Sequence, residues 1–269
     1  MSASNAPIVV KIGGSTLGAS DTSLHDVVAL QKQGRVPVVV HGGGPVISQW
    51  MQKQGLAPHF VRGLRVTDAP SLEIVVAVLA GLINKQLVAK IMALGGRVVG
   101  ISGADGGIIQ ARPADPDLGL VGEVTEINPE PVLEIMKAGY IPLLAPVGIH
   151  MVEASAKECS LLNINGDTAA GYLARALNAD KLVFLTDVEG VLDSSKRLIP
   201  RLTTREARTL ITSGTADGGM IPKLEACIKA LERIAVARIV DGRQPKALLH
   251  ALEGPGNGTR VTDTRTEKE

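Results

Sequence analysis

A lysine inside an apolar segment is the first residue of this chain that could do chemistry. Lys11 lies in the β-branched run Ile8–Ile12 and is followed by Gly13 and Gly14. An ammonium group among apolar strand residues costs free energy unless it meets an anion. A phosphate group reached through the glycine turn would be such an anion. The alternative is an edge-strand lysine that points to water, and this segment alone leaves both interpretations open.

A second glycine turn follows the apolar segment Val36–His41. Gly43 and Gly44 belong to three successive glycines, and Pro45 suits the first turn of a following helix. The backbone N–H groups of such a turn can converge on an anion, although a tight strand-to-helix connection is the alternative. We interpret His41 as a structural group, because nothing near it in sequence supplies the partner of a nucleophile–base pair.

Neither glycine turn has the spacing of a known nucleotide fingerprint. The P-loop requires two glycines four residues apart followed by Lys and Ser or Thr, and the dinucleotide fingerprint requires Gly-x-Gly-x-x-Gly with a downstream acid. The sequence therefore argues against a P-loop NTPase and against a dinucleotide-dependent enzyme.

Polar residues at 163–167 and a downstream lysine form a third group. Asn163 and Asp167 precede a predicted helix, where one such residue could be only an N-cap. That interpretation explains one residue and not the whole group: amides suit a substrate carboxylate or amide, and Asp167 could hold lysines by charge-assisted hydrogen bonds. Lys223 occupies the first turn of a predicted helix, where a cation opposes the helix dipole, which favours a role facing an anion.

Two further segments are candidates for ligand contact. Arg65 is a lone arginine in a short segment of β character, and it either offers a planar fork to a carboxylate or forms a surface ion pair. A polar turn after the strand Lys181–Thr186 and a loop before Lys223 would lie at the sheet edge where α/β proteins bind ligands. The nucleotide-site candidates in these two segments are Asp187, Val188, Glu189, Gly190, Val191, Leu192, Thr215, Ala216 and Asp217.

The elements that must position these residues alternate along the chain. Short apolar runs separated by segments of helical pattern predict an α/β protein with a largely parallel sheet covered on both faces. The predicted strands are Ile8–Ile12, Val36–His41, Arg97–Ile101, Tyr140–Ala145, Lys181–Thr186 and Ala235–Val240. The predicted helices are Ser23–Gln33, Pro45–Gln54, Pro70–Leu94, Pro129–Ala138, Asp167–Leu177, Thr204–Ser213 and Ile221–Leu231. A hairpin is predicted from Gly106–Arg112 and Gly122–Ile127.

Composition excludes several classes of partner. The chain has 28 basic and 27 acidic residues, and aromatic residues make up 2% of it. It therefore offers neither the charge nor the stacking platforms that nucleic acid or an anionic membrane would need, and a small-molecule partner is favoured. Cys159 and Cys227 are too few and too far apart for a disulfide framework or a zinc site, and we expect two reduced core thiols.

The protein is expected to stay in the cytoplasm. Residues 1–7 lack the basic region and apolar stretch of a signal peptide. The longest apolar run, Ile74–Ile83, is about half the length needed to cross a bilayer, so we assign it to a helix of a soluble protein. The predicted helix Pro70–Leu94 is apolar around more than one face, which predicts burial on both sides and a dimer interface.

Taken in chain order, these segments resemble the amino acid kinase family. Lys-x-Gly-Gly at 11–14 is similar to the family as a whole. Phe-Val-Arg-Gly-Leu-Arg-Val-Thr-Asp at 60–68, Leu-Glu at 72–73 and Gly-Leu-Ile-Asn-Lys at 81–85 are similar to those members that phosphorylate the side-chain carboxylate of N-acetyl-L-glutamate in arginine biosynthesis. The resemblance implies an open three-layer α/β/α sandwich with a mainly parallel central sheet, as in carbamate kinase.

The resemblance also implies a role for each candidate residue. Mg²⁺ would arrive with ATP as co-substrate, without protein ligands of its own. The acetylglutamate would contact Gly43, Gly44, Arg65 and Asn163. Lys11 and Lys223 would flank the transferring phosphoryl group, with Asp167 orienting both and Gly13 and Gly14 presenting amides to phosphate oxygens. ATP would lie along Asp187–Leu192 and Thr215–Asp217.

The organisation implied is an N-terminal acceptor-binding and dimerisation lobe, residues 1–177, and a C-terminal ATP-binding lobe, residues 178–269. Relatives inhibited by arginine carry an additional N-terminal helix, so we expect an arginine-insensitive homodimer formed through Pro70–Leu94. Gly166 stands where many relatives carry alanine, which removes no functional group.

Two alternatives stay open at this point. An aminoadipate kinase of lysine biosynthesis, acting on a carrier-linked or acetylated substrate, would share the machinery, because one methylene is weakly discriminated, by about 1–3 kcal/mol. The 63–68 segment favours acetylglutamate. A non-catalytic amino-acid-sensing subunit is the second alternative, and the presence of Lys11, Asp167 and Lys223 argues against it. A nitrogen-signalling protein partner is left undecided.

Overall fold

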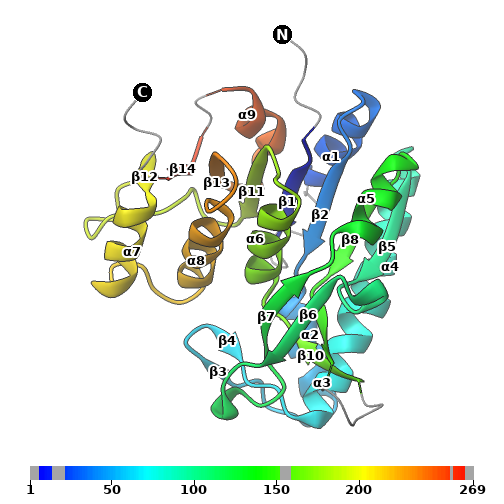
Figure 1. Ribbon diagram of the computed structural model, residues 1–269. Coiled ribbons are helices and arrows are strands. Elements are labelled where there is room, and N and C mark those ends of the chain that lie inside the picture. The colour runs from blue at the N-terminus through cyan, green and yellow to red at the C-terminus, as the bar shows by residue number, and fades with distance from the viewer. Residues whose placement is uncertain (1–5, 14–21, 152–158, 255–256, 264–269) are drawn as a thin grey trace.

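The computed structural model describes residues 6–13, 22–151, 159–254 and 257–263. Within these ranges an eight-stranded sheet forms the centre of the molecule (Figure 1). Its strand order is β12 (Arg201–Thr203), β14 (Thr259–Thr262), β13 (Val236–Asp241), β11 (Lys181–Thr186), β1 (Ile8–Ile12), β2 (Pro37–His41), β8 (Ile141–Ala145) and β5 (Val98–Ser102). The strands from β13 to β5 run parallel, and β14 runs antiparallel to β13.

Helices cover both faces of this sheet. One face packs against α1 (Ser23–Lys32), α4 (Asn84–Ala93) and α9 (Ala247–Glu253). The other packs against α5 (Glu130–Lys137), α6 (Gly166–Ala176), α7 (Thr204–Thr212) and α8 (Met220–Ala230). The predicted three-layer α/β/α sandwich with a mainly parallel sheet is thus confirmed. The strands and helices that were predicted in it have bounds within one or two residues of those expected, whereas β12, β14 and α9 were not predicted.

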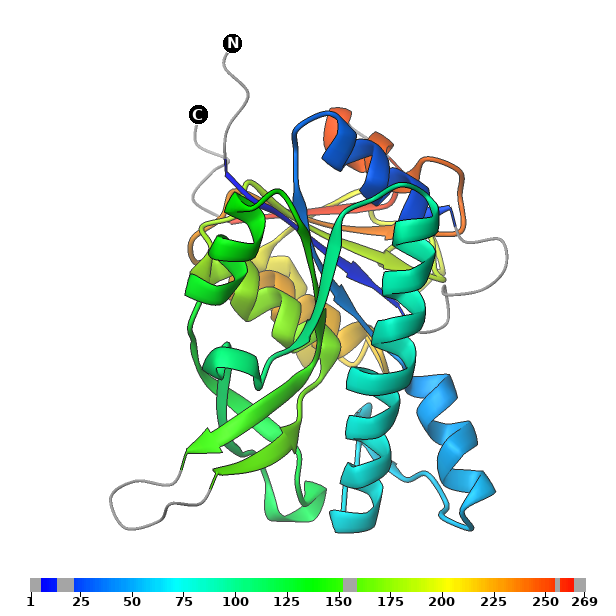
Figure 2. The ribbon, with the colours of Figure 1, turned by 90° about the vertical axis from the view of Figure 1, so that its right-hand side faces the viewer.

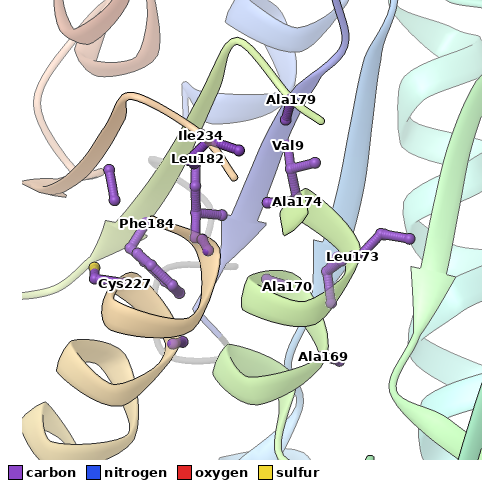
Figure 3. Close-up of a cluster of buried hydrophobic side chains, with 14 of the residues drawn as sticks. Val9, Ala169, Ala170, Leu173, Ala174, Ala179, Leu182, Phe184, Cys227 and Ile234 are labelled. Atoms are coloured by element: carbon purple, nitrogen blue, oxygen red, sulfur yellow. The ribbon is translucent and has the colours of Figure 1, made fainter. Parts of the chain in front are cut away.

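The aliphatic core divides between these two faces because successive strand residues point to opposite sides. Val9 and Phe184 pack towards α6 and α8, as the cluster in Figure 3 shows, whereas Val10 and Val39 pack towards α1 and α4. The buried thiol of Cys227 belongs to the first cluster, as expected, while the side chain of Cys159 lies outside the described part of the chain. Strands that are buried on both faces have continuous apolar sequences, which is why they could be predicted from the sequence.

A second, four-stranded sheet lies below the first in Figure 1. Its order is β10 (Cys159–Asn163), β9 (Val147–Met151), β6 (Ile109–Pro113) and β7 (Gly122–Ile127). The antiparallel pairing of β6 with β7 confirms the predicted hairpin. β9 and β10 were not predicted, nor was the short hairpin of β3 (Phe60–Val61) and β4 (Leu64–Arg65). Two 3₁₀ turns, η2 (Asp105–Gly107) and η3 (Pro116–Leu118), complete this region.

One continuous helical segment runs from Ala69 to Ala93, beside α2 (Gly44–Lys53) in Figure 2. It comprises α3 (Ala69–Val76), a π-helical segment η1 (Ala77–Ile83) and α4, where the sequence predicted one regular α-helix. By length and composition it is the one described helix that could cross a membrane, a test that core helices also pass, and 44% of its apolar window is buried within the protein.

The predicted boundary between lobes, at residue 177, falls between α6 and β11. At that point β11 pairs directly with β1, so strands from both parts of the chain form one continuous sheet. The division into two lobes with separate tasks stays a prediction.

Candidate active site

The candidate residues gather at the carboxyl ends of the central strands. Alternation along β1 places Lys11 on the same face as Val9, towards α6. α6 begins at Gly166, so its first turn carries Asp167 to the end of β1. α6 also packs against α8, whose first turn carries Lys223. Three elements therefore converge on one point, as α/β folds commonly arrange at this sheet edge.

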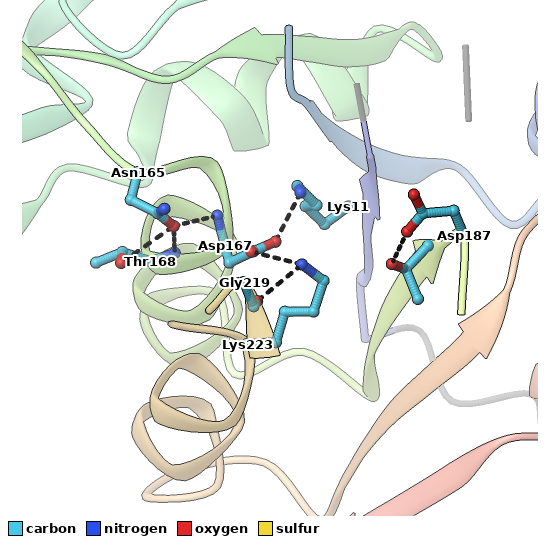
Figure 4. Close-up of polar contacts among 8 residues, drawn as sticks. Lys11, Asn165, Asp167, Thr168, Asp187, Gly219 and Lys223 are labelled. Atoms are coloured by element: carbon cyan, nitrogen blue, oxygen red, sulfur yellow. Dashed lines mark hydrogen bonds and ion pairs between the residues drawn. The ribbon is translucent and has the colours of Figure 1, made fainter. Parts of the chain in front are cut away.

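Asp167 lies between the two lysines (Figure 4). Its Oδ1 is 2.7 Å from Lys11 Nζ, and its Oδ2 accepts a hydrogen bond of 3.0 Å from Lys223 Nζ. Lys223 also donates to the carbonyl oxygen of Gly219, at 3.2 Å. The side chain of Asn165 caps α6 by accepting from the N–H groups of Asp167 and Thr168. Of the two amides in the 163–167 segment, Asn165 is therefore the helix cap.

The electrostatics of this group favour an anionic ligand. Burial alone would raise the pKa of the Asp167 carboxyl, but the ammonium groups of Lys11 and Lys223 outweigh burial and hold that pKa below its ordinary value of 3.8. Asp167 is therefore ionised at neutral pH. Two ammonium groups and one carboxylate leave one excess positive charge in a nearly buried place, with side-chain exposures of 9% for Lys11 and 13% for Lys223.

A hollow of about 410 Å³ opens on one side of the lysines. The sequence candidates that line it are Lys11, Gly13, Gly43, Gly44, Arg65, Asn163, Asp167, Asp187 and Lys223. Gly14 lies outside the described residues. The Arg65 guanidinium is fixed by hydrogen bonds to the carbonyl oxygen of Gly44 and to Ser48 Oγ, and it stacks on Phe60 with its Cζ 4.7 Å from the ring centre. Phe60, which also lines the hollow, was not among the candidates.

A short chain of hydrogen bonds orients Asn163. The hydroxyl of Thr67, which is fully buried, donates to the carbonyl oxygen of Arg65 and accepts from Asn163 Nδ2 at 2.9 Å. Because the nitrogen of the carboxamide is engaged with Thr67, its oxygen is left for the hollow. Asn163 can therefore accept a hydrogen bond from a ligand N–H group.

A second hollow, of about 350 Å³, lies on the other side of Lys223. It is lined by eight of the nine nucleotide-site candidates: Asp187, Val188, Gly190, Val191, Leu192, Thr215, Ala216 and Asp217. Glu189 lies apart from it, in a different hollow that also contains Leu198 and Asp241, because the chain turns at Gly190. The two hollows beside Lys223 share Thr186, Asp187, Gly219 and Lys223.

Several lining residues escaped the sequence reasoning. Lys196 lines the second hollow from a turn in which it has a positive φ of 62°, and Thr186 and Gly219 lie where the hollows meet. An Asp-Ser-Ser-Lys turn at 193–196 could have suggested the position of Lys196. Within the described ranges, no cluster of three or more His, Cys, Asp or Glu side chains could hold a metal ion.

This arrangement can bring two anions together. Lys223 lines both hollows and Lys11 lines one of them, glycine backbone lines one hollow, and no histidine is among the described lining residues. Charge neutralisation of this kind suits the transfer of a phosphoryl group to an acceptor that is already deprotonated.

Comparison with known proteins gives three relationships. The model of the amino acid kinase family matches residues 6–241. The chain is 42% identical to acetylglutamate kinase of Dehalococcoides mccartyi, over 96% of this chain and 95% of that protein, and 45% identical to acetylglutamate kinase of a Synechococcus strain, over 94% and 85%. Giardia carbamate kinase, 17% identical, shares the fold with a TM-score of 0.70 over 97% of this chain and all of that one.

Proposed function

This chain belongs to the amino acid kinase family, and from that premise we propose that it transfers the γ-phosphoryl group of ATP to the side-chain carboxylate of N-acetyl-L-glutamate. One observation carries the proposal: Asp167 holds Lys11 and Lys223 at the junction of two hollows, one glycine-lined and one formed by the segments expected to bind nucleotide. The reaction belongs to arginine biosynthesis, and the enzyme would act in the cytoplasm.

The chemistry needs charge neutralisation and not a base. A carboxylate oxygen of the acceptor attacks the γ-phosphorus, the bond from that phosphorus to the β–γ bridging oxygen breaks, and ADP leaves with the electron pair. No proton moves, because the acceptor is already deprotonated at neutral pH. Lys11 would approach the phosphoryl group from the acceptor side and Lys223 from the nucleotide side. Both reduce the repulsion between two anions, most strongly in the in-line transition state.

The glycine-lined hollow supplies groups that match N-acetylglutamate. The Arg65 guanidinium offers a positive charge to a carboxylate, with both Nη2 hydrogens already held by Gly44 and Ser48, and the Asn163 oxygen suits the N–H of the acetamido group. The backbone of Gly43 and Gly44 would contact the acceptor as well. An aminoadipate acceptor is not favoured, since both relatives compared above bear the name acetylglutamate kinase.

ATP would lie in the second hollow, from Asp187 to Leu192 and over Thr215, with Gly13 and Gly14 towards its phosphates. Mg²⁺ would enter bound to those phosphates, because this ion keeps most of its water and prefers phosphate oxygens with one or two carboxylates. It would reduce the charge of the triphosphate. Asp187, which lines both hollows, would face such a nucleotide.

We further propose a homodimer formed through the helical segment from Ala69 to Ala93. Its outer side exposes the small residues Ala77, Gly81 and Ala89 together with Lys85, and beyond them Met92, whose exposed fraction is 61%. Small side chains allow two helices to approach closely. Light scattering at micromolar concentration should give twice the mass of 28.0 kDa, and a monomeric mass would refute the interface. Millimolar arginine should leave both the mass and the activity unchanged.

Trapping of the product as a hydroxamate tests the function directly, because hydroxylamine captures acyl phosphates. Mg-ATP would be supplied with N-acetyl-L-glutamate, free glutamate or N-acetyl-aminoadipate. Signal with acetylglutamate supports the proposal, and signal only with the aminoadipate derivative would refute acetylglutamate as the substrate.

Lys11→Ala and Lys223→Ala should each lower kcat about a hundredfold or more, as removal of an electrostatic stabiliser does. Near-normal kcat in either variant would contradict the roles proposed for these lysines.

A further inference from the structure

His41 is fully buried at the end of β2, and its side chain faces away from the two lysines of the site. Alternation along the strand places it with Val39, towards the helical segment from Ala69 to Ala93. The pKa of His41 is lowered to about 4, chiefly by burial and to a smaller extent by the positive charges of Lys11 and Lys85, although the hydrogen bond to Gly42 raises it. The imidazole is therefore neutral at neutral pH.

The hydrogen bonds of this neutral ring define its tautomer. Nδ1 lies 3.1 Å from the carbonyl oxygen of Gly42, so Nδ1 carries the hydrogen and donates. Nε2 lies 3.2 Å from Asn84 Nδ2 and therefore accepts. The amide of Asn84 cannot be reversed, because its Oδ1 accepts from Lys85 Nζ at 2.9 Å and its Nδ2 also faces the carbonyl oxygens of Leu143, at 3.0 Å, and Ile101, at 3.3 Å.

The π-helical segment η1 (Ala77–Ile83) explains how Asn84 reaches this position. In a π-helix the hydrogen bond joins residues five apart, so Leu79 and Asn84 return to the same side of the helix. Leu79 and Ile83 lie against Gly43, where a β-carbon would collide with both side chains. The same side of the helix therefore contacts the glycine turn with apolar groups and His41 with a carboxamide.

The ring of His41 fixes one peptide group of the glycine turn. In a trans peptide the C=O and the following N–H point in opposite directions, so holding the Gly42 carbonyl against His41 turns the N–H of Gly43 away from the helix. The next two carbonyls are also engaged, that of Gly43 by the N–H of Ile47 and that of Gly44 by Arg65. Within the described chain, nothing accepts a hydrogen bond from the N–H of Gly43 or Gly44.

We infer that His41 and Asn84 are positioning residues, which hold the Gly42–Gly43 peptide so that the N–H of Gly43 faces the glycine-lined hollow. The inference rests on the proposed function, because the anion that this N–H would meet is the acceptor carboxylate or the transferring phosphoryl group. Neither side chain touches a substrate. Both act through the backbone, and Asn84 acts through His41.

Kinetics on matched variants separate positioning from stability. Loss of an aligned donor lowers kcat, so His41→Leu should lower kcat at least tenfold with the KM for ATP within threefold, because ATP lies in the other hollow. His41→Asn should restore kcat to within threefold of the natural protein, since its amide nitrogen occupies the place of Nδ1. Val39→Ala is the control: it removes packing from the same face of β2 and should lower Tm but leave kcat within twofold.

A double-mutant cycle tests whether Asn84 acts through His41. Asn84→Leu should lower kcat about tenfold in the natural protein and cause no further loss in the His41→Leu background. Independent, multiplicative losses would overturn the inference. So would a His41→Leu enzyme with kcat within twofold of normal at a temperature where it is folded, or a His41→Asn enzyme no better than His41→Leu.

Nuclear magnetic resonance tests the hydrogen bonds of His41 independently of enzymatic activity. Nitrogen-15 in the histidine rings should show His41 as the neutral Nδ1–H tautomer from pH 8 down to pH 5, and the Nε2–H tautomer would overturn the inference. His41–Gly42 is the one His–Gly step in the chain, so carbonyl-labelled histidine with ¹⁵N-glycine isolates the Gly42 amide. That signal should move in Asn84→Leu and stay in place in Val39→Ala. If the natural protein formed no hydroxamate, the proposed function would fail while these spectra still tested the turn.

Discussion

Replacement of Asp167 by asparagine removes the negative charge that lies between Lys11 and Lys223. Lys11 and Lys223 each lie within 3.0 Å of its carboxylate, and its side chain is only 6% exposed. In Asp167→Asn the two ammonium groups would face each other across a neutral amide. Removing one partner of a buried ion pair costs about 3–5 kcal/mol, and we take the lower end, about 3 kcal/mol, because Lys223 can move its ammonium group towards water. For a chain of this size that corresponds to a fall in Tm of about 6–12 °C.

The same replacement should lower kcat about a hundredfold or more, since neither lysine would be held at the junction of the hollows. Thermal unfolding and hydroxamate formation would be measured on the same preparation. Glu134→Gln is the matched control, because it makes the same chemical change in an exposed pair with Lys137 and should leave both Tm and kcat unaltered. An Asp167→Asn enzyme with normal Tm and kcat would refute the reasoning.

The pH dependence of this difference has a definite sign. The folded-state pKa of Asp167 is held below 3.8, so its contribution to stability is present above the unfolded-state value and is lost as pH falls through the folded-state value. The asparagine variant has no group to titrate there. The gap in Tm between the two proteins should therefore be complete at pH 7 and shrink below about pH 4. A difference in Tm that grew at acid pH would contradict the lowered pKa of Asp167.

Three further substitutions follow from the packing. Burial raises the pKa of Asp26, so its charged form destabilises the fold at pH 7. Asp26→Asn removes that charge and keeps an oxygen that can accept from the N–H of Leu248, so it should raise Tm at pH 7. The gain in Tm should disappear as pH falls through the raised pKa, because Asp26 is then neutral as well. Gly171→Ala places a β-carbon 2.6 Å from the carbonyl oxygen of Ala226 and should lower Tm and kcat together. Gly43→Ala places a methyl group against the helix behind the glycine turn, and the hydroxamate assay should show at least a tenfold loss of kcat.

Most of the fold could be predicted because its strands are buried on both faces. Such strands are continuous apolar runs, and Lys11 was noticed because it is the one charge in the run Ile8–Ile12. β10 lacks this pattern, so the sequence did not show that a strand ends at Asn163 and that Asn165 then caps α6. Without the position of the strand end, the sequence could not tell which of Asn163 and Asn165 caps α6.

The remaining differences arise from backbone geometry that side-chain patterns do not encode. Ala-Val-Leu-Ala-Gly-Leu-Ile at 77–83 is apolar on several sides, so its pattern fits an α-helix as well as a π-helix. Gly190 turns the chain at an extended positive φ of 152°, which separates Glu189 from the other residues of its segment. α9 was missed because it has only seven residues and follows Lys246, whose φ is positive.

The relative positions of Lys11 and Lys223 depend chiefly on α6, which lies between the elements that carry them. Lys11 comes from the first strand and Lys223 from a helix about 210 residues later, but both meet a carboxylate at the start of α6. α6 packs against β1 on one side and α8 on the other, and Gly171 allows α8 to approach closely. The spacing of these elements therefore sets the distance between the two cations before any substrate enters. Preorganised charge of this kind needs no rearrangement at the moment of transfer, and in the function proposed above it would accelerate the reaction without a base.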